Sequence, residues 1–501
     1  MTVEAPPVAY SPVVLEAIET VEAVALHQVP GADDVFPRRW VGLAAILAAT
    51  LMNLLDSTVS NIAAPSIQAS LGGSSSTLQW IAAGYTLALA VGLLVGGRLG
   101  DMFGRKRMFM VGVAGFVVSS AACAFAWSPE SLIGARAIQG AFGALMIPQC
   151  FGLIRDMFGR EMGKAFAAFG PAIGLATIIG PVVGGLLIEW DVFDLGWRTI
   201  FAINLPLGAV AAYVGMKVLP SVEPTARGSR LDVVGAAVAG LGMLLLVYPL
   251  VAGHEAGWPT WSYVALAAAV PVFASFVIQQ RRRAASGRTG LVELSVFKKR
   301  SYVSGVAFVV AFFGSVVGFG LAVGLFLQLG LGYDALDSSL TQLTWPVGAF
   351  VGTAIGATLM NKLGRTILHI GLSIMVVGLV GLFLVFSADA GFWVLAAPMF
   401  AYGAGMGMIF IPLYDIIVAD LDDHEVGSAS GILESLQQLG ASLGVAVLGT
   451  VFFSVANVEN WTDVAASVDA AKVVTVLAGV LTAVAFAIAF WLPKKAKEQA
   501  W

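Results

Sequence analysis

The stretch Gly97-Arg-Leu-Gly-Asp-Met-Phe-Gly-Arg-Lys-Arg107 joins two apolar runs, each long enough to cross a membrane as a helix. A carboxylate flanked by glycines and followed by a tight basic turn is typical of a very short loop between two membrane-spanning helices. In such a loop Asp101, between Gly97 and Gly104, can hold arginines such as Arg105 and face the ends of neighbouring helices. We expect these four residues to form a reversible lock on one conformation.

The composition indicates an all-α integral membrane protein. Apolar residues make up 58% of the 501 residues and charged residues only 12%. A spanning helix needs about 20 mostly apolar residues, and a β-barrel would show short alternating segments instead. Fourteen runs meet the helical requirement. The predicted spans are Val41–Ala64, Leu78–Gly97, Met108–Trp127, Leu132–Ile154, Ala165–Ile188, Thr199–Met216, Val233–Ala252, Trp261–Ile278, Tyr302–Leu327, Leu340–Met360, Ile367–Phe386, Phe392–Val418, Val426–Val455 and Val473–Leu492.

Basic residues predict the orientation in the membrane. An even number of spans places both termini on the same side. Of the 27 Lys and Arg, all but Arg136, Arg198 and Lys472 fall at the N-terminal flank, in even-to-odd connections or at the C-terminus. The positive-inside rule therefore predicts a multi-pass protein of the cell (cytoplasmic) membrane with both termini in the cytoplasm. Residues 1–37, without Lys or Arg, read as a disordered tail, in which Val13–Leu26 could form a short amphipathic helix, and no cleavable signal peptide is expected.

The chain also repeats itself. A shift of 260 residues lays Gly180-Pro-Val-Val-Gly184 over Gly440-Ala-Ser-Leu-Gly444 and Gly104-Arg105 over Gly364-Arg365. Parallel repeats with a substrate route at their interface are a transporter architecture. The predicted organisation is a cytoplasmic N-terminal tail (1–37), a six-helix half (38–218), an inserted pair of helices seven and eight with a basic cytoplasmic linker (219–299), a second six-helix half (300–493) and a cytoplasmic C-terminal tail (494–501). We expect the linker from Arg281 to Arg300 to be helical and to lie on the membrane surface.

Charged residues at membrane depth are costly and need a reason. Asp56 lies about 16 residues into span one, roughly 12 Å short of its outer end, and Arg136 lies roughly 6–9 Å from the same surface in span four. These depths are compatible with an ion pair or a shared water-filled cavity. Proton binding by Asp56 would remove its charge and weaken the pairing, which would bias a conformation. A static ion pair is the alternative.

Glu434 lies about eight residues, or roughly 12 Å, inside the cytoplasmic start of span thirteen, and Gln437 and Gln438 follow one turn later. This polar stripe predicts a second proton-coupling or cation-binding site. The alternative is a structural carboxyl held neutral by burial.

Aromatic side chains mixed with sparse polar groups on the spans are candidates for a substrate cavity. Aromatic faces can hold cations or planar apolar compounds, and poorly directional contacts favour promiscuous binding. Packing between helices is the other explanation for each of them. The candidates are Asn53, Tyr85, Gln139, Phe313, Gln328, Trp345, Tyr402, Gln437 and Gln438.

Four ordered motifs carry a family resemblance. They are Leu55-Asp-Ser-Thr-Val-Ser-Asn-Ile-Ala-Ala-Pro65, Arg136-Ala-Ile-Gln-Gly140, Gly174-Leu-Ala-Thr-Ile-Ile-Gly-Pro-Val-Val-Gly-Gly185 and Trp197-Arg-Thr-Ile-Phe-Ala-Ile-Asn-Leu-Pro-Leu-Gly208. Together with the loop at Asp101 they resemble the major facilitator superfamily, in particular its fourteen-span drug:proton antiporter branch. The third motif resembles the one that separates exporters from importers. Its glycines permit close helix contact and its proline bends the span, so Gly174, Gly180, Pro181, Gly184 and Gly185 are expected to form a hinge between the halves.

The resemblance implies a proton-coupled exporter of amphipathic or cationic small molecules that works by alternating access. A dedicated exporter of a lipid, siderophore or secondary metabolite is the alternative. The expected partners are protons, a small-molecule substrate and the lipid bilayer, with no cofactor, metal or nucleic acid and with a monomeric state. An integral membrane enzyme would need clustered ligating or catalytic groups, whereas His27, His254, His369 and His424 are scattered.

Overall fold

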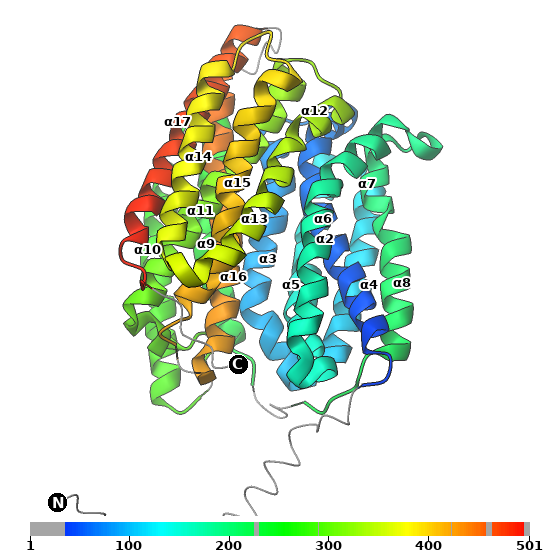
Figure 1. The fold of residues 1–501 in the computed structure, drawn as a ribbon, viewed down its shortest axis with the longest axis vertical. Coiled ribbons are helices and arrows are strands. Elements are labelled where there is room, and N and C mark those ends of the chain that lie inside the picture. The colour runs from blue at the N-terminus through cyan, green and yellow to red at the C-terminus, as the bar shows by residue number, and fades with distance from the viewer. Residues whose placement is uncertain (1–35, 225–229, 289, 422, 457–462, 495–501) are drawn as a thin grey trace, which may run out of the picture.

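The computed structural model describes residues 36–224, 230–288, 290–421, 423–456 and 463–494, and in these stretches the chain forms helices and no strands (Figure 1). The predicted tails lie almost entirely outside the described residues, including Val13–Leu26. By length and composition, thirteen described helical segments can cross a membrane. The helix α6 (Met162–Glu189), with its apolar stretch Ile178–Glu189, supplies the remaining predicted span. The all-α membrane fold is confirmed.

The remaining elements follow the predicted order of spans. They are α2 (Arg39–Leu71), α3 (Ser75–Phe103), α4 (Arg105–Ala124), α5 (Pro129–Phe158), η1 (Gly159–Glu161), η2 (Val192–Asp194), η3 (Gly196–Arg198), α7 (Thr199–Ala202), α8 (Asn204–Val218), α9 (Val233–Glu255), α10 (Thr260–Ala285), η4 (Leu294–Lys298), α11 (Arg300–Leu325), η5 (Phe326–Gly330), α12 (Ala335–Gln342), α13 (Thr344–Leu363), α14 (Thr366–Val385), α15 (Phe392–Ile417), α16 (Asp423–Ala456) and α17 (Val464–Ala489).

Two predicted spans are broken helices, each interrupted shortly before a proline. Span six is divided into α7 and α8 at Ile203, three residues before Pro206. Span ten is divided into α12 and α13 at Leu343, three residues before Pro346. Proline has no N–H and its ring clashes with the carbonyl four residues earlier, so the helical ladder is interrupted there.

The basic linker differs from its prediction. The helix α10 continues to Ala285, but the helical structure then stops, and only the short 3-10 helix η4 precedes α11. The expected surface helix between Arg281 and Arg300 is therefore wrong for most of its length. Gly287 lies two residues past the end of α10 and has a φ of 66°, a backbone conformation that favours glycine.

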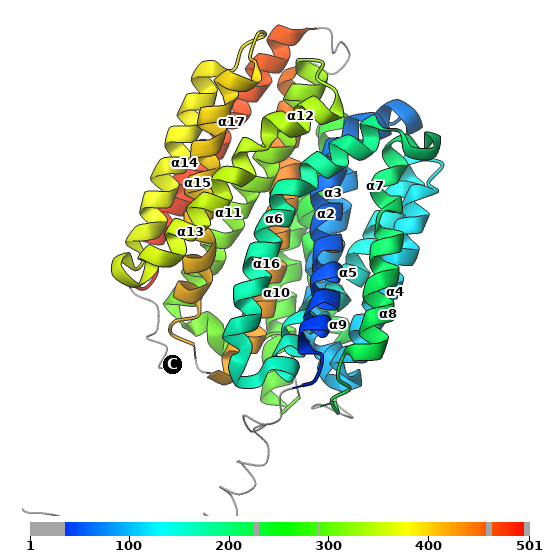
Figure 2. The ribbon, with the colours of Figure 1, turned by 45° about the vertical axis from the view of Figure 1, so that its right-hand side comes forward.

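The helices pack in two groups with a hairpin beside them. We call α2–α8 the N-terminal group and α11–α17 the C-terminal group, because the helices within each set contact one another extensively. Figure 2 shows the two groups side by side along the long axis of the molecule. The hairpin α9–α10 lies beside both groups, since α9 contacts α3 of the first and α16 of the second.

Corresponding glycines set corresponding helix contacts in the two groups. A Cβ on Gly184 of α6 would stand 2.5 Å from Val59 of α2, and a Cβ on Gly444 of α16 would stand 2.0 Å from the Gly314 carbonyl of α11. The internal repeat seen in the sequence thus corresponds to a repeated packing arrangement, in which the close approach of the neighbouring helix requires a residue without a side chain.

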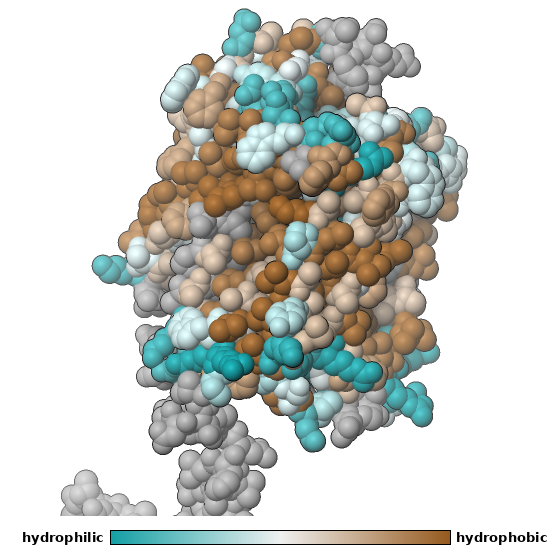
Figure 3. Space-filling model, turned by 90° about the vertical axis from the view of Figure 1, so that its right-hand side faces the viewer, coloured by the Kyte–Doolittle hydropathy of each residue, from teal (hydrophilic) through white to brown (hydrophobic). Residues whose placement is uncertain are grey.

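The face shown in Figure 3 divides into an apolar belt and two polar ends. We call the end where α2 ends and α3 begins the distal end, and the opposite end, where α2 begins, the proximal end. Many large apolar side chains are exposed on the described helices, which is the pattern expected of a surface facing lipid rather than water.

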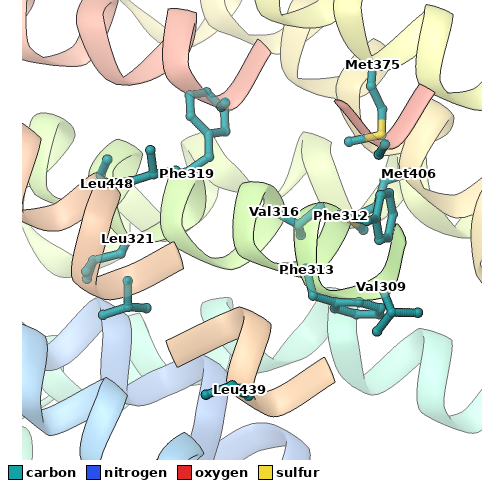
Figure 4. Packing of buried hydrophobic residues seen from close by; sticks show 14 of the residues in the cluster. Val309, Phe312, Phe313, Val316, Phe319, Leu321, Met375, Met406, Leu439 and Leu448 are labelled. Atoms are coloured by element: carbon teal, nitrogen blue, oxygen red, sulfur yellow. The ribbon is translucent and has the colours of Figure 1, made fainter. Parts of the chain in front are cut away.

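The C-terminal group has an aromatic core. Phe312 and Phe313 of α11 meet edge to face with ring centroids 5.2 Å apart, and Phe313 also contacts Phe410 of α15 at 5.6 Å. Figure 4 shows Phe312 and Phe313 among the buried apolar side chains of this core, close to Val309. Edge-to-face pairs at such distances favour one fixed packing of the rings.

Candidate functional site

The centre of the N-terminal group holds a buried ion pair. Asp56 lies near the middle of α2 and Arg136 two turns into α5, and their side chains pair directly, Nη1 to Oδ2. Their exposures are 2% and 1%. The sequence placed the two residues at compatible depths, and the structure confirms the contact.

Amide groups complete the coordination of the carboxylate. The second oxygen of Asp56, Oδ1, accepts hydrogen bonds from Gln139 Nε2 at 2.7 Å and from Asn204 Nδ2 at 2.9 Å. Both amides also donate to Ser120 Oγ, at 2.8 and 3.2 Å. A buried charge is tolerated only when it is paired and its remaining lone pairs are satisfied, and these contacts meet that condition.

Three of the residues in this network were not predicted from the sequence to surround Asp56. Gln139 was expected to line a cavity, but it is fully buried and instead bridges Arg136 and Asp56. Ser120 and Asn204 were not predicted. Asn204 is a polar residue within an apolar span, and its place at the start of α8, next to the break caused by Pro206, was the available signal.

The arginine is held from its other side by aromatic rings and a backbone carbonyl. Its guanidinium carbon lies 4.2 Å from the ring centroid of Tyr85 and 5.6 Å from that of Phe201. Its Nε donates to the Ile81 carbonyl at 3.3 Å. Tyr85 in turn accepts a hydrogen bond at 2.6 Å from Asn53, whose side chain is half-buried. A chain of contacts therefore runs from Asp56 to Asn53, and cation–π attraction forms one step of it.

Glu434 lies apart from this network, where the two helix groups face each other. It is half-buried on α16 and close enough to Cys150 of α5 and Tyr414 of α15 to interact electrostatically with both. Tyr414 donates a hydrogen bond to Gln437, and Gln438 is half-buried one residue further on. The predicted polar stripe on α16 therefore lies close to α5 of the N-terminal group and to α15 of the C-terminal group.

The remaining cavity candidates take part in packing or in contacts between the groups. Tyr402 is fully buried and meets Trp345 edge to face at 4.8 Å, while Trp345 Nε1 donates to Met406 Sδ at 3.5 Å. Gln328, in the π-helical turn η5, donates to the Ile62 carbonyl of α2 at 3.0 Å. Gln328 therefore joins the two groups near their distal ends.

The loop that opened the sequence analysis forms a charge cluster at the proximal end. Arg105 lies 3.6 Å from Asp101 and donates to both oxygens of Asp156 at 2.9 and 3.2 Å. Gly104 turns the chain with a φ of 94°, and a Cβ on Gly152 would stand 2.5 Å from the Arg105 side chain. All of these residues belong to the N-terminal group, so the contacts seen here brace that group internally.

Two features of this cluster went beyond the prediction. Asp156, near the end of α5, was not predicted and is the main partner of Arg105. A small recess beside the loop, of about 20 Å³, is lined in addition by Val222, Glu223 and Pro224, which follow α8. Gly97 lies next to Pro148 of α5, with 3.9 Å of room for a Cβ.

The glycines of α6 face two different neighbours. Gly180 and Gly184 lie against Leu55 and Val59 of α2. Gly185 instead faces the C-terminal group, where a Cβ would stand 2.9 Å from the Ala335 carbonyl of α12. Pro181 lies inside the helix between these contacts, and Gly174 lies in the part of α6 whose side chains the structure does not describe.

Comparison with known proteins decides the family. Residues 46–232 and 223–445 match the family model of the Major Facilitator Superfamily. This chain belongs to the Major Facilitator Superfamily. Solved structures of the same architecture include an auto inhibited POT family peptide transporter, with a TM-score of 0.66, 15% identity and coverage of 93% of this chain and 99% of that one. At that identity the likeness concerns the fold alone.

Curated relatives of this Major Facilitator Superfamily chain are named for antibiotic export and resistance. The "Probable actinorhodin transporter" of Streptomyces coelicolor is 46% identical over 83% of this chain and 73% of its own length. The "Tetracenomycin C resistance and export protein" of Streptomyces glaucescens is 33% identical over 83% and 76%. The "Multidrug efflux pump LfrA" of Mycolicibacterium smegmatis is 31% identical over 83% and 81%. The chain is thus a multi-pass membrane transporter related to efflux proteins.

Proposed function

We propose that this protein exports a small organic molecule in exchange for protons, with Asp56 as the group that takes up the proton. The observation that carries the proposal is the ion pair between Asp56 and Arg136, which is buried in the middle of the N-terminal group and contacted by residues of α3, α5, α7 and α8. An ionisable pair at this depth is expensive, and in membrane proteins such pairs mark ion and proton pathways.

Protonation of Asp56 would act on the cavity through Arg136. A neutral carboxyl attracts the guanidinium less, so Arg136 would then be held mainly by its contacts with the Tyr85 ring and the Ile81 carbonyl. Tyr85 carries the change to Asn53, since the two side chains are hydrogen-bonded. In this proposal Asn53 and Tyr85 connect the proton site with the cargo. Glu434 provides a second carboxylate on α16, where the C-terminal group faces the N-terminal group.

The cycle would follow alternating access, with the proximal end in the cytoplasm. The contact of Gln328 with Ile62 and the contact of Gly185 with α12 would part when the distal side opens. Inward movement of one proton charge yields about 2.3 kcal/mol per 100 mV. Because 1.4 kcal/mol is a factor of ten, 100 mV supports roughly a 50-fold gradient of an uncharged cargo before any pH difference is added.

For the cargo we infer a secondary metabolite rather than a broad range of drugs. The 46% identity to a protein named for actinorhodin, against 31% to one named as a multidrug pump, supports this choice. A multidrug range remains the second candidate, because the polar stripe at Glu434 would also suit cationic compounds.

The test is uptake into inverted membrane vesicles of a panel comprising actinorhodin, tetracenomycin C, cationic dyes, neutral drugs and lipids. We expect uptake of the first two compounds driven by an imposed proton gradient, and no such uptake by Asp56→Asn inserted at the same level. Undiminished uphill transport by Asp56→Asn would remove Asp56 from the mechanism. Preferential uptake of the dyes would favour the multidrug alternative.

A further inference from the structure

The inserted hairpin α9–α10 occupies the seam between the two helix groups. The helix α9 contacts both α3 and α16, which themselves pack against each other. Along that seam Thr86 of α3 and Ser442 of α16 share a hydrogen bond of 2.6 Å, and Ser435 donates to the Ala90 carbonyl at 2.6 Å. Any movement of one group against the other must therefore be accommodated by α9.

The distal end of the hairpin is bound to the N-terminal group by one carboxylate. Glu255, the last residue of α9, accepts hydrogen bonds from the Ser76 backbone N–H at 2.6 Å and from the hydroxyls of Ser74, Ser75 and Ser76 at 2.8 to 2.9 Å. These groups form the start of α3, where the positive end of the helix dipole favours an anion. The attachment is thus multiple and charge-assisted.

The hairpin contacts the C-terminal group more weakly at the same end. Thr450 of α16 donates to the Leu250 carbonyl of α9 at 2.9 Å, and its hydroxyl also lies 3.4 Å from the amide of Gln79. These are neutral hydrogen bonds. Because charge-assisted bonds are roughly twice as strong as neutral ones, the Thr450 contacts are the ones expected to part first.

At its proximal end the hairpin is attached to the C-terminal group, through the linker that follows α10. Asp232, at the start of α9, accepts from Gln279 and Gln280 of α10 at 2.6 to 3.1 Å. Gln280 then accepts from the Leu291 backbone N–H at 2.9 Å. The linker continues to Lys299, whose amine lies 2.7 Å from Glu425 of α16.

We propose that the hairpin is a strap that crosses the interface between the two helix groups. It stays attached to α3 at its distal end and, through the linker, to α16 at its proximal end. Glu255 is the residue that positions it. The proposal rests on the proposed alternating-access function, because it concerns how the two groups move. In the cycle, the distal contacts of α9 with Thr450 break while those of Glu255 persist. The strap thereby limits how far the distal ends of the two groups separate.

Distance measurements between paired spin labels in lipid nanodiscs test this proposal on the full chain. Exposed distal positions are available on each part: Ser70 on the N-terminal group, Thr260 on the hairpin and Ser454 on the C-terminal group. Each pair of sites is labelled through introduced cysteines, and distances are compared between alkaline and acidic buffer. The Ser70–Ser454 distance reports the movement itself and needs no knowledge of the cargo.

We expect the Ser70–Ser454 and Thr260–Ser454 distances to change together while the Thr260–Ser70 distance stays constant. In Glu255→Ala the Thr260–Ser70 distribution should broaden, whereas Asp463→Ala, which removes a distal carboxylate that caps α17, should leave it unchanged. A constant Thr260–Ser454 distance, or no broadening in Glu255→Ala, would overturn the strap. A Ser70–Ser454 distance that never changes would instead contradict the proposed alternating access.

Discussion

At the scale of single residues, substitutions of Arg136 can show whether its ion pair with Asp56 couples transport to protons or only stabilises the fold. In Arg136→Gln the carboxylate of Asp56 is left buried without its cation, which costs about 3–5 kcal/mol of stability. The double variant Asp56→Asn/Arg136→Gln removes both charges and should recover most of this loss in thermal unfolding. We expect neither variant to transport. Restored transport in the double variant would show that the pair is purely structural.

Glu434 gives a second prediction at this scale. Glu434→Gln keeps the size and hydrogen-bonding capacity of the side chain but removes the negative charge that faces Cys150 and Tyr414. Uptake of cationic compounds into vesicles should fall more than tenfold, while neutral compounds keep their rates, because a carboxylate in a partly dry site attracts cations strongly. Glu434→Asp, which keeps the negative charge, is the matched control and should retain the preference for cationic compounds. Equal losses for both cargo types would assign Glu434 a structural role.

Sequence reasoning found the charged members of the site but not their neutral partners. The cost of a charge in the membrane makes Asp56 and Arg136 conspicuous, and helix rise alone fixes their depths. Gln139 and Asn204 are harder to place, because their contacts depend on how each helix is rotated about its axis. That rotation is set by packing against α2 and α4, which no single span encodes.

At the scale of elements, Gly185 is the position where α6 meets the other helix group. Gly185→Leu would push against the backbone of α12, with Leu336 Cα only 2.9 Å from the added Cβ, and overpacking typically costs about 1–3 kcal/mol. We expect slower transport, with a raised population of the distally open form in spin-label distances. Gly134→Leu on α5, where a Cβ would meet nothing within 4 Å, should behave as wild type. Loss of transport in both would indicate a general intolerance of bulk.

The proximal starts of α2 and α6 are joined by Glu161, which pairs with Arg39 and accepts from Lys164 at 2.6 Å. The Lys164 hydrogen bond, with the help of Arg39, lowers the pKa of Glu161 below its usual range. A carboxylate with a lowered folded-state pKa adds stability above its unfolded pKa and loses it as the pH falls through the folded value. Glu161→Gln should therefore lower Tm at neutral pH but not in strong acid. An equal Tm difference at both pH values would contradict this link.

The elements themselves were largely predictable, and the misses have local causes. The breaks at Ile203 and Leu343 follow from Pro206 and Pro346, which the sequence displays. The helix α2 continues to Leu71, past the predicted end at Ala64, because Pro65 is accommodated inside it. The linker after α10 was read as helical from its basic residues, but charge does not determine backbone conformation.

At the scale of the whole molecule, transport should respond to voltage and to pH difference as separate driving forces. In proteoliposomes with each force clamped in turn, either one alone should support uphill movement of a neutral cargo, since the proton then carries one net charge inward. Collapse of both should abolish accumulation. Accumulation at an undiminished rate after both are collapsed would exclude proton coupling for this protein.

The overall arrangement could be predicted only in part. The two groups follow from the internal repeat and from the count of spans. The position of the hairpin did not follow, because α9 and α10 have no counterpart in the repeat and their contacts with α3 and α16 are long-range. Only the three-dimensional structure shows that the insertion bridges both groups.

Among the described residues, the side chains that hold the Asp56 carboxylate come from α4, α5 and α8 of the N-terminal group, so the machinery that senses hydrogen ions is modular. A hybrid that joins residues 1–299 of this chain to the corresponding C-terminal segment of a relative would inherit this chain's dependence on acidity together with an altered choice of compounds. Such exchanges would allow cargo preference to diversify among relatives while the energy-harvesting module is preserved.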